Sequence, residues 1–219
     1  PDFRFLRFLV KRVDPIMPWR APATRFPTLV EGQSPHLLLE TLGDVLLPPL
    51  AKFHDTAGRR MPRFDNKDMM RFVNSGTMSW GQALLITEAN LKGEILNGGV
   101  DQFFFNSPFL AIEIPEVLDR FAPAEVALVY RRIIPEMTRA MARFSLEDPV
   151  DHDLLHEICE LPRSRHGDVL SEFEDAFCGL DETLRFADDP VSESSWSNML
   201  ADTVVRYVMA NKTEFVMGA

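Results

Sequence analysis

Apolar residues recur every three or four positions along most of the chain, a pattern typical of helices that bury one face. The clearest case follows Pro123, and its expected buried face consists of Val126, Tyr130, Ile133, Met137, Met141 and Phe144. The regular alternation of strands and helices that marks a parallel sheet is missing. The pattern therefore predicts an all-α fold, a compact multi-helix domain.

Caps and turn residues divide this helical region into elements. Ser34 followed by Pro35 predicts a helix start, and Pro48-Pro49 predicts an interruption. Asn97-Gly98-Gly99 predicts a left-handed stop at the end of a helix. Further helices are expected over residues 77–96, 103–105, 123–144, 151–161, 166–177 and 197–215, and one more in which Pro115 stands near the beginning.

The first 33 residues have a different pattern. Phenylalanines interleave with arginines up to Arg12, and four prolines from Pro15 to Pro27 then follow without a helical period. We expect an extended N-terminal arm over residues 1–33 with room for one short strand, and a single helical domain over residues 34–219. Because this arm is so apolar, we expect it to pack on its own domain, on a second subunit or on a partner.

One segment has a specific local pattern of polar and aromatic residues. Its signature residues are Glu94, Asn97, Gly98, Gly99, Gln102, Phe103, Phe104 and Asn106. We interpret it as a helix that ends in a glycine turn and is re-entered at once, with the aromatic residues in the core. Asn97, Gln102 and Asn106 are then expected to bind exposed backbone groups at the corner.

This segment, NGG-x-x-QFF-x-N with a preceding glutamate, resembles the signature of the bacterial DNA-mimic protein family, most of whose members are domains of unknown function. The resemblance covers about residues 77–217. It implies an all-helical fold, often a homodimer, in which one member uses surface carboxylates to occupy the DNA site of a transcription factor. The signature itself identifies the scaffold, so a mimic function has to come from the surface.

Charge is concentrated toward the end of the chain. The formal net charge is −10, and residues 145–219 carry 17 acidic and 5 basic residues. Such a surface repels nucleic acid and attracts basic proteins, so direct nucleic-acid binding is not expected. Two acidic rows are candidate partner-binding residues: Asp148, Asp151, Asp153, Glu157 and Glu160, followed by Glu172, Glu174, Asp175, Asp181 and Glu182.

Evidence for catalysis is weak. His152 and His156 are one helical turn apart, as in metal-binding helices, but Asp153 stands where a zinc protease has its glutamate base. No serine lies in a nucleophile elbow, and no glycine-rich phosphate loop is present. Cys159 and Cys178 look like small core residues. We therefore expect no enzyme activity, no cofactor and no metal site.

No apolar run approaches the roughly 20 residues that a membrane crossing needs, and no secretory signal is recognisable, so a cytoplasmic, non-membrane protein is expected. The leading hypothesis is a non-enzymatic acidic module that binds a basic protein; its specific form is a DNA mimic that occupies the DNA-binding surface of a transcription factor or another basic protein. An immunity-type toxin inhibitor and a metal-dependent hydrolase using His152 and His156 are the alternatives. A homodimer is compatible with each.

Overall fold

The computed structural model describes residues 21–22, 26–28, 32–46, 69–142, 152–179 and 195–217. A helical segment over residues 35–46 comes first. It is followed by α2 (Met69–Asn74), α3 (Trp80–Asn106), α4 (Pro108–Phe121), α5 (Ala124–Ile133), α6 (Pro135–Met141), α7 (His152–Cys159), α8 (Leu161–Cys178), α9 (Trp196–Ala210) and α10 (Lys212–Phe215). The all-α prediction is confirmed.

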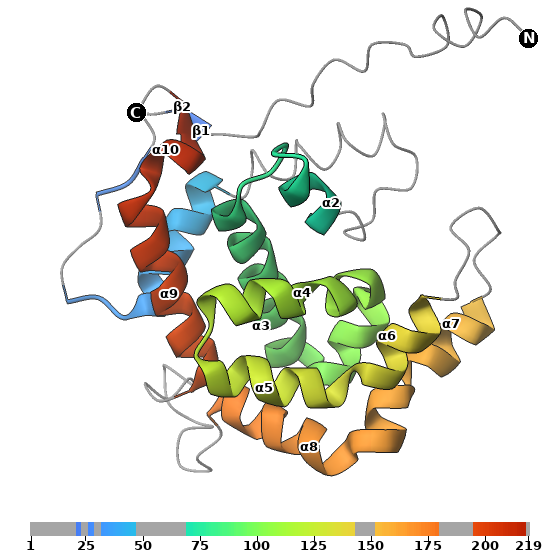
Figure 1. Cartoon of the computed structure of the whole chain (residues 1–219). Coiled ribbons are helices and arrows are strands. Elements are labelled where there is room, and N and C mark those ends of the chain that lie inside the picture. The colour runs from blue at the N-terminus through green and yellow to red at the C-terminus, as the bar shows by residue number, and fades with distance from the viewer. Residues whose placement is uncertain are drawn as a thin grey trace, which may run out of the picture.

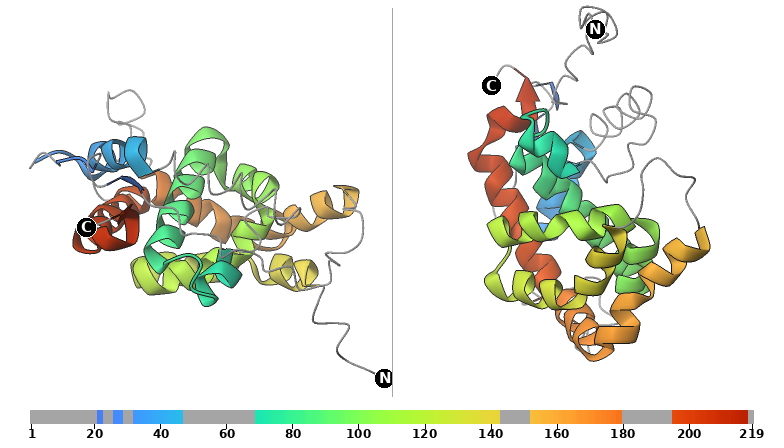
Figure 2. Two further views of the ribbon diagram at one scale, coloured as in Figure 1. Left: turned by 90° about the horizontal axis from the view of Figure 1, so that it is seen from above. Right: turned by 45° about the vertical axis from the view of Figure 1, so that its right-hand side comes forward.

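Helix α3 runs through the middle of the molecule, and the other helices pack around it (Figure 1). Helices α4 and α9 both pack against α3, and α5 packs against both α4 and α8. Figure 2 shows α7 projecting from the body of the fold in both views. Because α3 contacts most of the other described helices, its local geometry determines where they lie.

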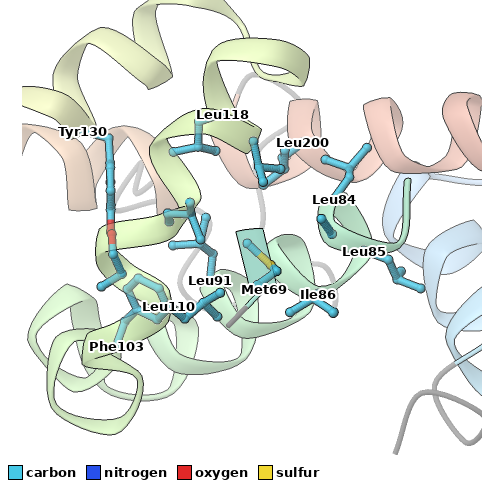
Figure 3. Close-up of a cluster of buried hydrophobic side chains, with 14 of the residues drawn as sticks. Met69, Leu84, Leu85, Ile86, Leu91, Phe103, Leu110, Leu118, Tyr130 and Leu200 are labelled. Carbon is cyan, nitrogen blue, oxygen red and sulfur yellow. The ribbon is translucent and has the colours of Figure 1, made fainter. Parts of the chain in front are cut away.

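A buried apolar cluster fills the space between these helices (Figure 3). Leu91 and Phe103 of α3 meet Leu110 of α4, while Leu200 reaches the cluster from α9. The expected core face after Pro123 is confirmed at its five described positions, all of which are buried. Phe144, the sixth, lies outside the described residues.

The predicted helix over residues 123–144 is wrong as a single helix. The chain leaves helical geometry at Ile134, which separates α5 from α6. Proline at position 135 causes the break, because it has no N–H to continue the backbone ladder and it disfavours helical geometry in the residue before it. Apolar residues keep their spacing across this break, because α5 and α6 both bury their apolar residues in the core.

The predicted position of Pro115 near a helix start is also wrong. Helix α4 begins at Pro108, where a proline in the first turn leaves no unsatisfied N–H, and Pro115 lies inside the helix. The carbonyl oxygen of Ala111, four residues earlier, accepts a 2.8 Å hydrogen bond from the hydroxyl of Tyr130. A side chain of α5 thus replaces the donor that Pro115 cannot supply.

A two-residue parallel pairing joins the ends of the described chain. Ala21–Pro22 (β1) pairs with Val216–Met217 (β2), with Ala21 opposite Val216. The short strand expected in the N-terminal arm is therefore present at this place. Helix α2 was not predicted. None of the described helices combines the length and the apolar character that a membrane crossing requires.

Candidate functional site

The corner inside α3 is built around the carboxylate of Glu94. Its Oε2 atom accepts a 2.7 Å hydrogen bond from Gln102 Nε2 and a 2.8 Å hydrogen bond from Asn106 Nδ2. The prediction that these two amides bind backbone groups is therefore wrong, because a carboxylate on the same helix is the stronger acceptor. Asn97 is exposed beside the corner. The signature residues thus hold two halves of one helix together.

The two glycines of the corner allow the break in α3. Gly99 has φ +82° and ψ 176°, a region that is almost confined to glycine. A Cβ atom at Gly99 would lie 2.6 Å from Glu174 Oε1 of α8, and one at Gly98 would lie 1.9 Å from Gln102 Oε1. Phe103 and Phe104, which follow the break, are fully buried. The segment is a packing device that seats α8 against α3.

Six of the ten predicted partner-binding acids lie within the described residues. Asp148, Asp151, Asp181 and Glu182 lie outside them. Five of the six are exposed: Asp153, Glu157 and Glu160 in α7 and its end, and Glu172 and Asp175 on α8. Glu174 is half-buried against the Gly99 backbone instead. The structure therefore places Glu174 at the corner and the other five on the surface.

Sequence reasoning missed Asp168, which is exposed on α8. It precedes Glu172 by four residues and Asp175 by seven, so the three carboxylates share one face of the helix. The spacing i, i+4, i+7 could have identified it, and Asp153, Glu157 and Glu160 repeat the same spacing. We call Asp168, Glu172 and Asp175, with Glu157 and Glu160 beyond the helix junction, the acidic ridge.

The two parts of the ridge follow one another around a bend. Helix α7 meets the beginning of α8 at an angle in each view (Figures 1 and 2). Helix α8 bends again at His166, where φ is −137°. The described members of the two expected acidic rows therefore lie on two helices that are joined by a bend.

Ion pairing distinguishes the ridge from many other acids of the fold. Elsewhere, Asp101 pairs with Arg163, Asp119 with Arg131, Glu136 with Arg139, Asp202 with Arg206, and Glu40 with Lys92. Hydrogen bonding to Arg131 lowers the pKa of Asp119, and hydrogen bonding to His166 lowers the pKa of Glu136. In the described part of the chain, no carboxylate of the ridge forms such a pair. Its charges are free to meet an external cation.

The histidines and cysteines considered for catalysis lie on α7 and α8. Across the described stretches, no three His, Cys, Asp or Glu side chains are grouped closely enough to hold a metal ion. His156 is exposed, and its ring centroid lies 4.7 Å from that of Phe105; the side chain of His152 lies outside the described residues. Burial raises the pKa of both cysteine thiols to about 11. Both cysteines are buried and free, as expected of small core residues.

Comparison with known proteins adds a family. A family model described as DMP19-like protein matches residues 78–206, from just before α3 into α9. No curated protein and no solved structure matches the chain. The matched residues include the corner of α3 and all of α7 and α8. Because the match covers more than half of the 219 residues, the chain belongs to the DMP19-like protein family, which is a family of DNA-mimic proteins.

Proposed function

We propose that this protein is a non-enzymatic DNA mimic that presents its acidic ridge to the DNA-binding surface of a basic protein. The observation that carries the proposal is the unpaired row of Asp168, Glu172 and Asp175 on the exposed face of α8. Membership of the DMP19-like family supports the same role. The partner is defined by its chemistry, a basic DNA-binding surface.

The charge density of the ridge can be compared with that of DNA. A helix rises about 1.5 Å per residue, so Asp168 and Asp175 are separated by roughly 10 Å along the axis and the ridge has about one charge per 5 Å. One strand of duplex DNA has one charge per 3.4 Å or so. The ridge on α8 therefore approaches the charge density of one strand over about three phosphates. Glu157 and Glu160 add two exposed carboxylates on the other side of the bend.

Charges around the ridge reinforce its field. Residues 152–178 contain seven carboxylates and two arginines, and one of these arginines, Arg163, is engaged by Asp101. A field of this sign raises the rate of encounter with a basic protein and falls with ionic strength. Binding through the ridge is therefore expected to be salt-sensitive and to compete with DNA.

The test is capture of partners by the immobilised protein from a lysate of the organism that encodes it. We expect DNA-binding proteins, identified by mass spectrometry, to be retained at low salt, and to be released by added duplex DNA. The purified partner is then titrated at several salt concentrations. If about three ridge charges are engaged, the affinity should fall steeply with salt, as it does for a protein leaving DNA.

Two double variants with the same change of charge provide the control. Glu172→Gln with Asp175→Asn neutralises the ridge, and Asp44→Asn with Glu116→Gln neutralises two exposed acids on other elements. We expect the first variant to lose at least about tenfold in affinity and the second to lose little. Equal losses, or a partner that resists both high salt and duplex DNA, would contradict mimicry through this ridge.

A further inference from the structure

A cavity of about 660 Å³ lies between the helical segment over residues 35–46 and the first half of α3. Its walls include Leu39, Glu40 and Asp44 from the first segment and Leu85, Glu88 and Lys92 from α3. The volume is in the range of pockets that hold small organic molecules. The wall formed by residues 39–44 lies outside the matched residues 78–206, so the cavity is only partly built from the family region.

Glu88 is the unusual residue of this cavity. Its side chain belongs to the buried part of α3, with 3% relative exposure, and its Oε1 atom is buried with no hydrogen-bond partner among the described residues. Burial raises the pKa of this carboxyl to about 7, and Lys92, one turn later, opposes that rise. An unpaired buried carboxyl is costly for a fold unless something else binds it.

The other charges of the cavity indicate the sign of a ligand. Glu40 and Asp44 add two carboxyl groups, and the one ammonium group among the described lining residues, Lys92 Nζ, lies 4.0 Å from Glu40 Oε1. Lys92 is thus already engaged by Glu40, while Glu88 in the cavity wall keeps an acceptor that has no hydrogen-bond partner among the described residues. The excess of acids favours a cation.

A metal ion does not suit this arrangement. Glu40, Asp44 and Glu88 are not grouped closely enough in the described structure to share one ion. Leu39, Leu85 and Leu96 also line the cavity, so much of its wall is apolar. A ligand with one cationic head and an apolar body matches both features.

We propose that the cavity between residues 35–46 and α3 binds a small organic cation, whose ammonium group donates a hydrogen bond to Glu88 and whose apolar body packs on Leu39, Leu85 and Leu96. The proposal is independent of the DNA-mimic function, because it uses none of the ridge residues. It assigns a second binding site to the protein.

The test uses phenylbutylammonium as the probe and phenylbutanol as its uncharged counterpart, in isothermal titrations of the full chain at about pH 8. A ligand of this size is expected to bind with a dissociation constant on the order of 0.1 to 1 mM. The alcohol should bind at least about tenfold more weakly, since it leaves the charge of Glu88 unmatched. Titration at about pH 5.5 should also weaken binding of the ammonium probe, as Glu88 takes up a proton beside Glu40, Asp44 and Lys92.

Two variants locate the probe. Glu88→Gln keeps the size of the side chain and should reduce the affinity at least about tenfold. Gly93→Phe fills the cavity without changing a charge, and an added Cβ at Gly93 meets no atom within 4 Å, so this variant is expected to fold. It should abolish binding. Glu157→Gln, on the ridge, should leave the probe affinity unchanged.

Three results would contradict a cation site in this cavity. Saturable binding that survives both Glu88→Gln and Gly93→Phe would overturn the proposal, as would equal affinity for the ammonium and the alcohol. Absence of saturation at roughly ten times the expected dissociation constant would also overturn it. None of these outcomes would affect the partner capture experiment, because the ridge is untouched.

Discussion

The hydroxyl of Tyr130 donates a 2.8 Å hydrogen bond to the carbonyl oxygen of Ala111, although the two residues belong to different helices. In a continuous helix that carbonyl would accept from the N–H of residue 115, which is a proline. Tyr130 and Ala111 are both fully buried, so no bulk water can take this role. The aromatic residue of α5 therefore makes the internal proline of α4 tolerable.

Tyr130→Phe removes this donor and leaves the Ala111 carbonyl buried without a partner. We expect the free energy of unfolding to fall by about 1 to 3 kcal/mol, as for other unsatisfied buried groups. Urea unfolding followed by circular dichroism measures the difference. The phenyl ring stays in place, so the loss reports the hydrogen bond and not a cavity.

Pro115→Ala provides the matched background, since alanine restores the missing N–H of α4. In this background, Tyr130→Phe should cost clearly less than in the natural sequence. An equal cost in both backgrounds would show that Ala111 does not depend on Tyr130 for its hydrogen bond.

Gly99→Ala tests the break in α3. The backbone of Gly99 is in a region that other residues avoid, and the new Cβ would lie 2.6 Å from Glu174 Oε1. We expect a loss of about 1 to 3 kcal/mol in unfolding free energy. Gly93→Ala, on the regular part of the same helix, should instead gain about 0.5 to 1 kcal/mol. Similar effects at both positions would mean that the break is not required.

Glu94→Ala tests the bonds across that break. It leaves the side-chain amides of Gln102 and Asn106 without their shared acceptor. The expected loss is about 1 to 3 kcal/mol, measured by thermal or urea unfolding. Glu94→Gln keeps one carbonyl oxygen and should lose less. If the two variants were equally unstable, the carboxylate oxygens would not be the stabilising atoms.

Glu88 should make stability depend on pH. Its pKa is raised by burial from 4.5 to about 7, so the folded state holds the proton more tightly than the unfolded state. Its contribution is most favourable below about pH 4.5 and is lost as the pH rises through about 7. Glu88→Gln removes this dependence. The variant should therefore gain stability relative to the natural protein between about pH 5 and pH 8, by up to about 3 kcal/mol.

Urea unfolding at several pH values measures this gain. Glu157→Gln serves as the control, because Glu157 is exposed and its neutralisation should not change the pH profile. A difference between Glu88→Gln and the natural protein that stays constant with pH would contradict a raised pKa at Glu88.

Much of the helical arrangement was predictable from the sequence, because it depends on local signals. The apolar period after Pro123 identified buried residues, and Gly98-Gly99 identified the break in α3. The exact helix limits were not predictable at Pro115 and Pro135. One of these prolines is accommodated by Tyr130 from another helix and the other breaks the helix, and only tertiary contacts distinguish the two cases.

The acidic composition of the ridge was predictable from the sequence, but the positions of its residues were predictable only in part. Exposure of Glu172 and Asp175 follows from helical spacing, whereas the position of Glu174 against Gly99 depends on how α8 docks on α3. Asp168 could have been found by extending the same spacing one turn earlier. The burial of Glu88 could not, since it requires the helical segment over residues 35–46 to lie beside α3.

The separation between the corner of α3 and the exposed face of α8 affects how such a protein can evolve. A substitution at Gly99 acts on the packing of two helices, whereas substitutions at Glu172 or Asp175 alter exposed side chains and typically change stability by less than about 0.5 kcal/mol. Selection on folding therefore restrains the corner strongly and the outer face of α8 weakly. The charge pattern of that face can therefore drift from one lineage to the next while the fold stays the same.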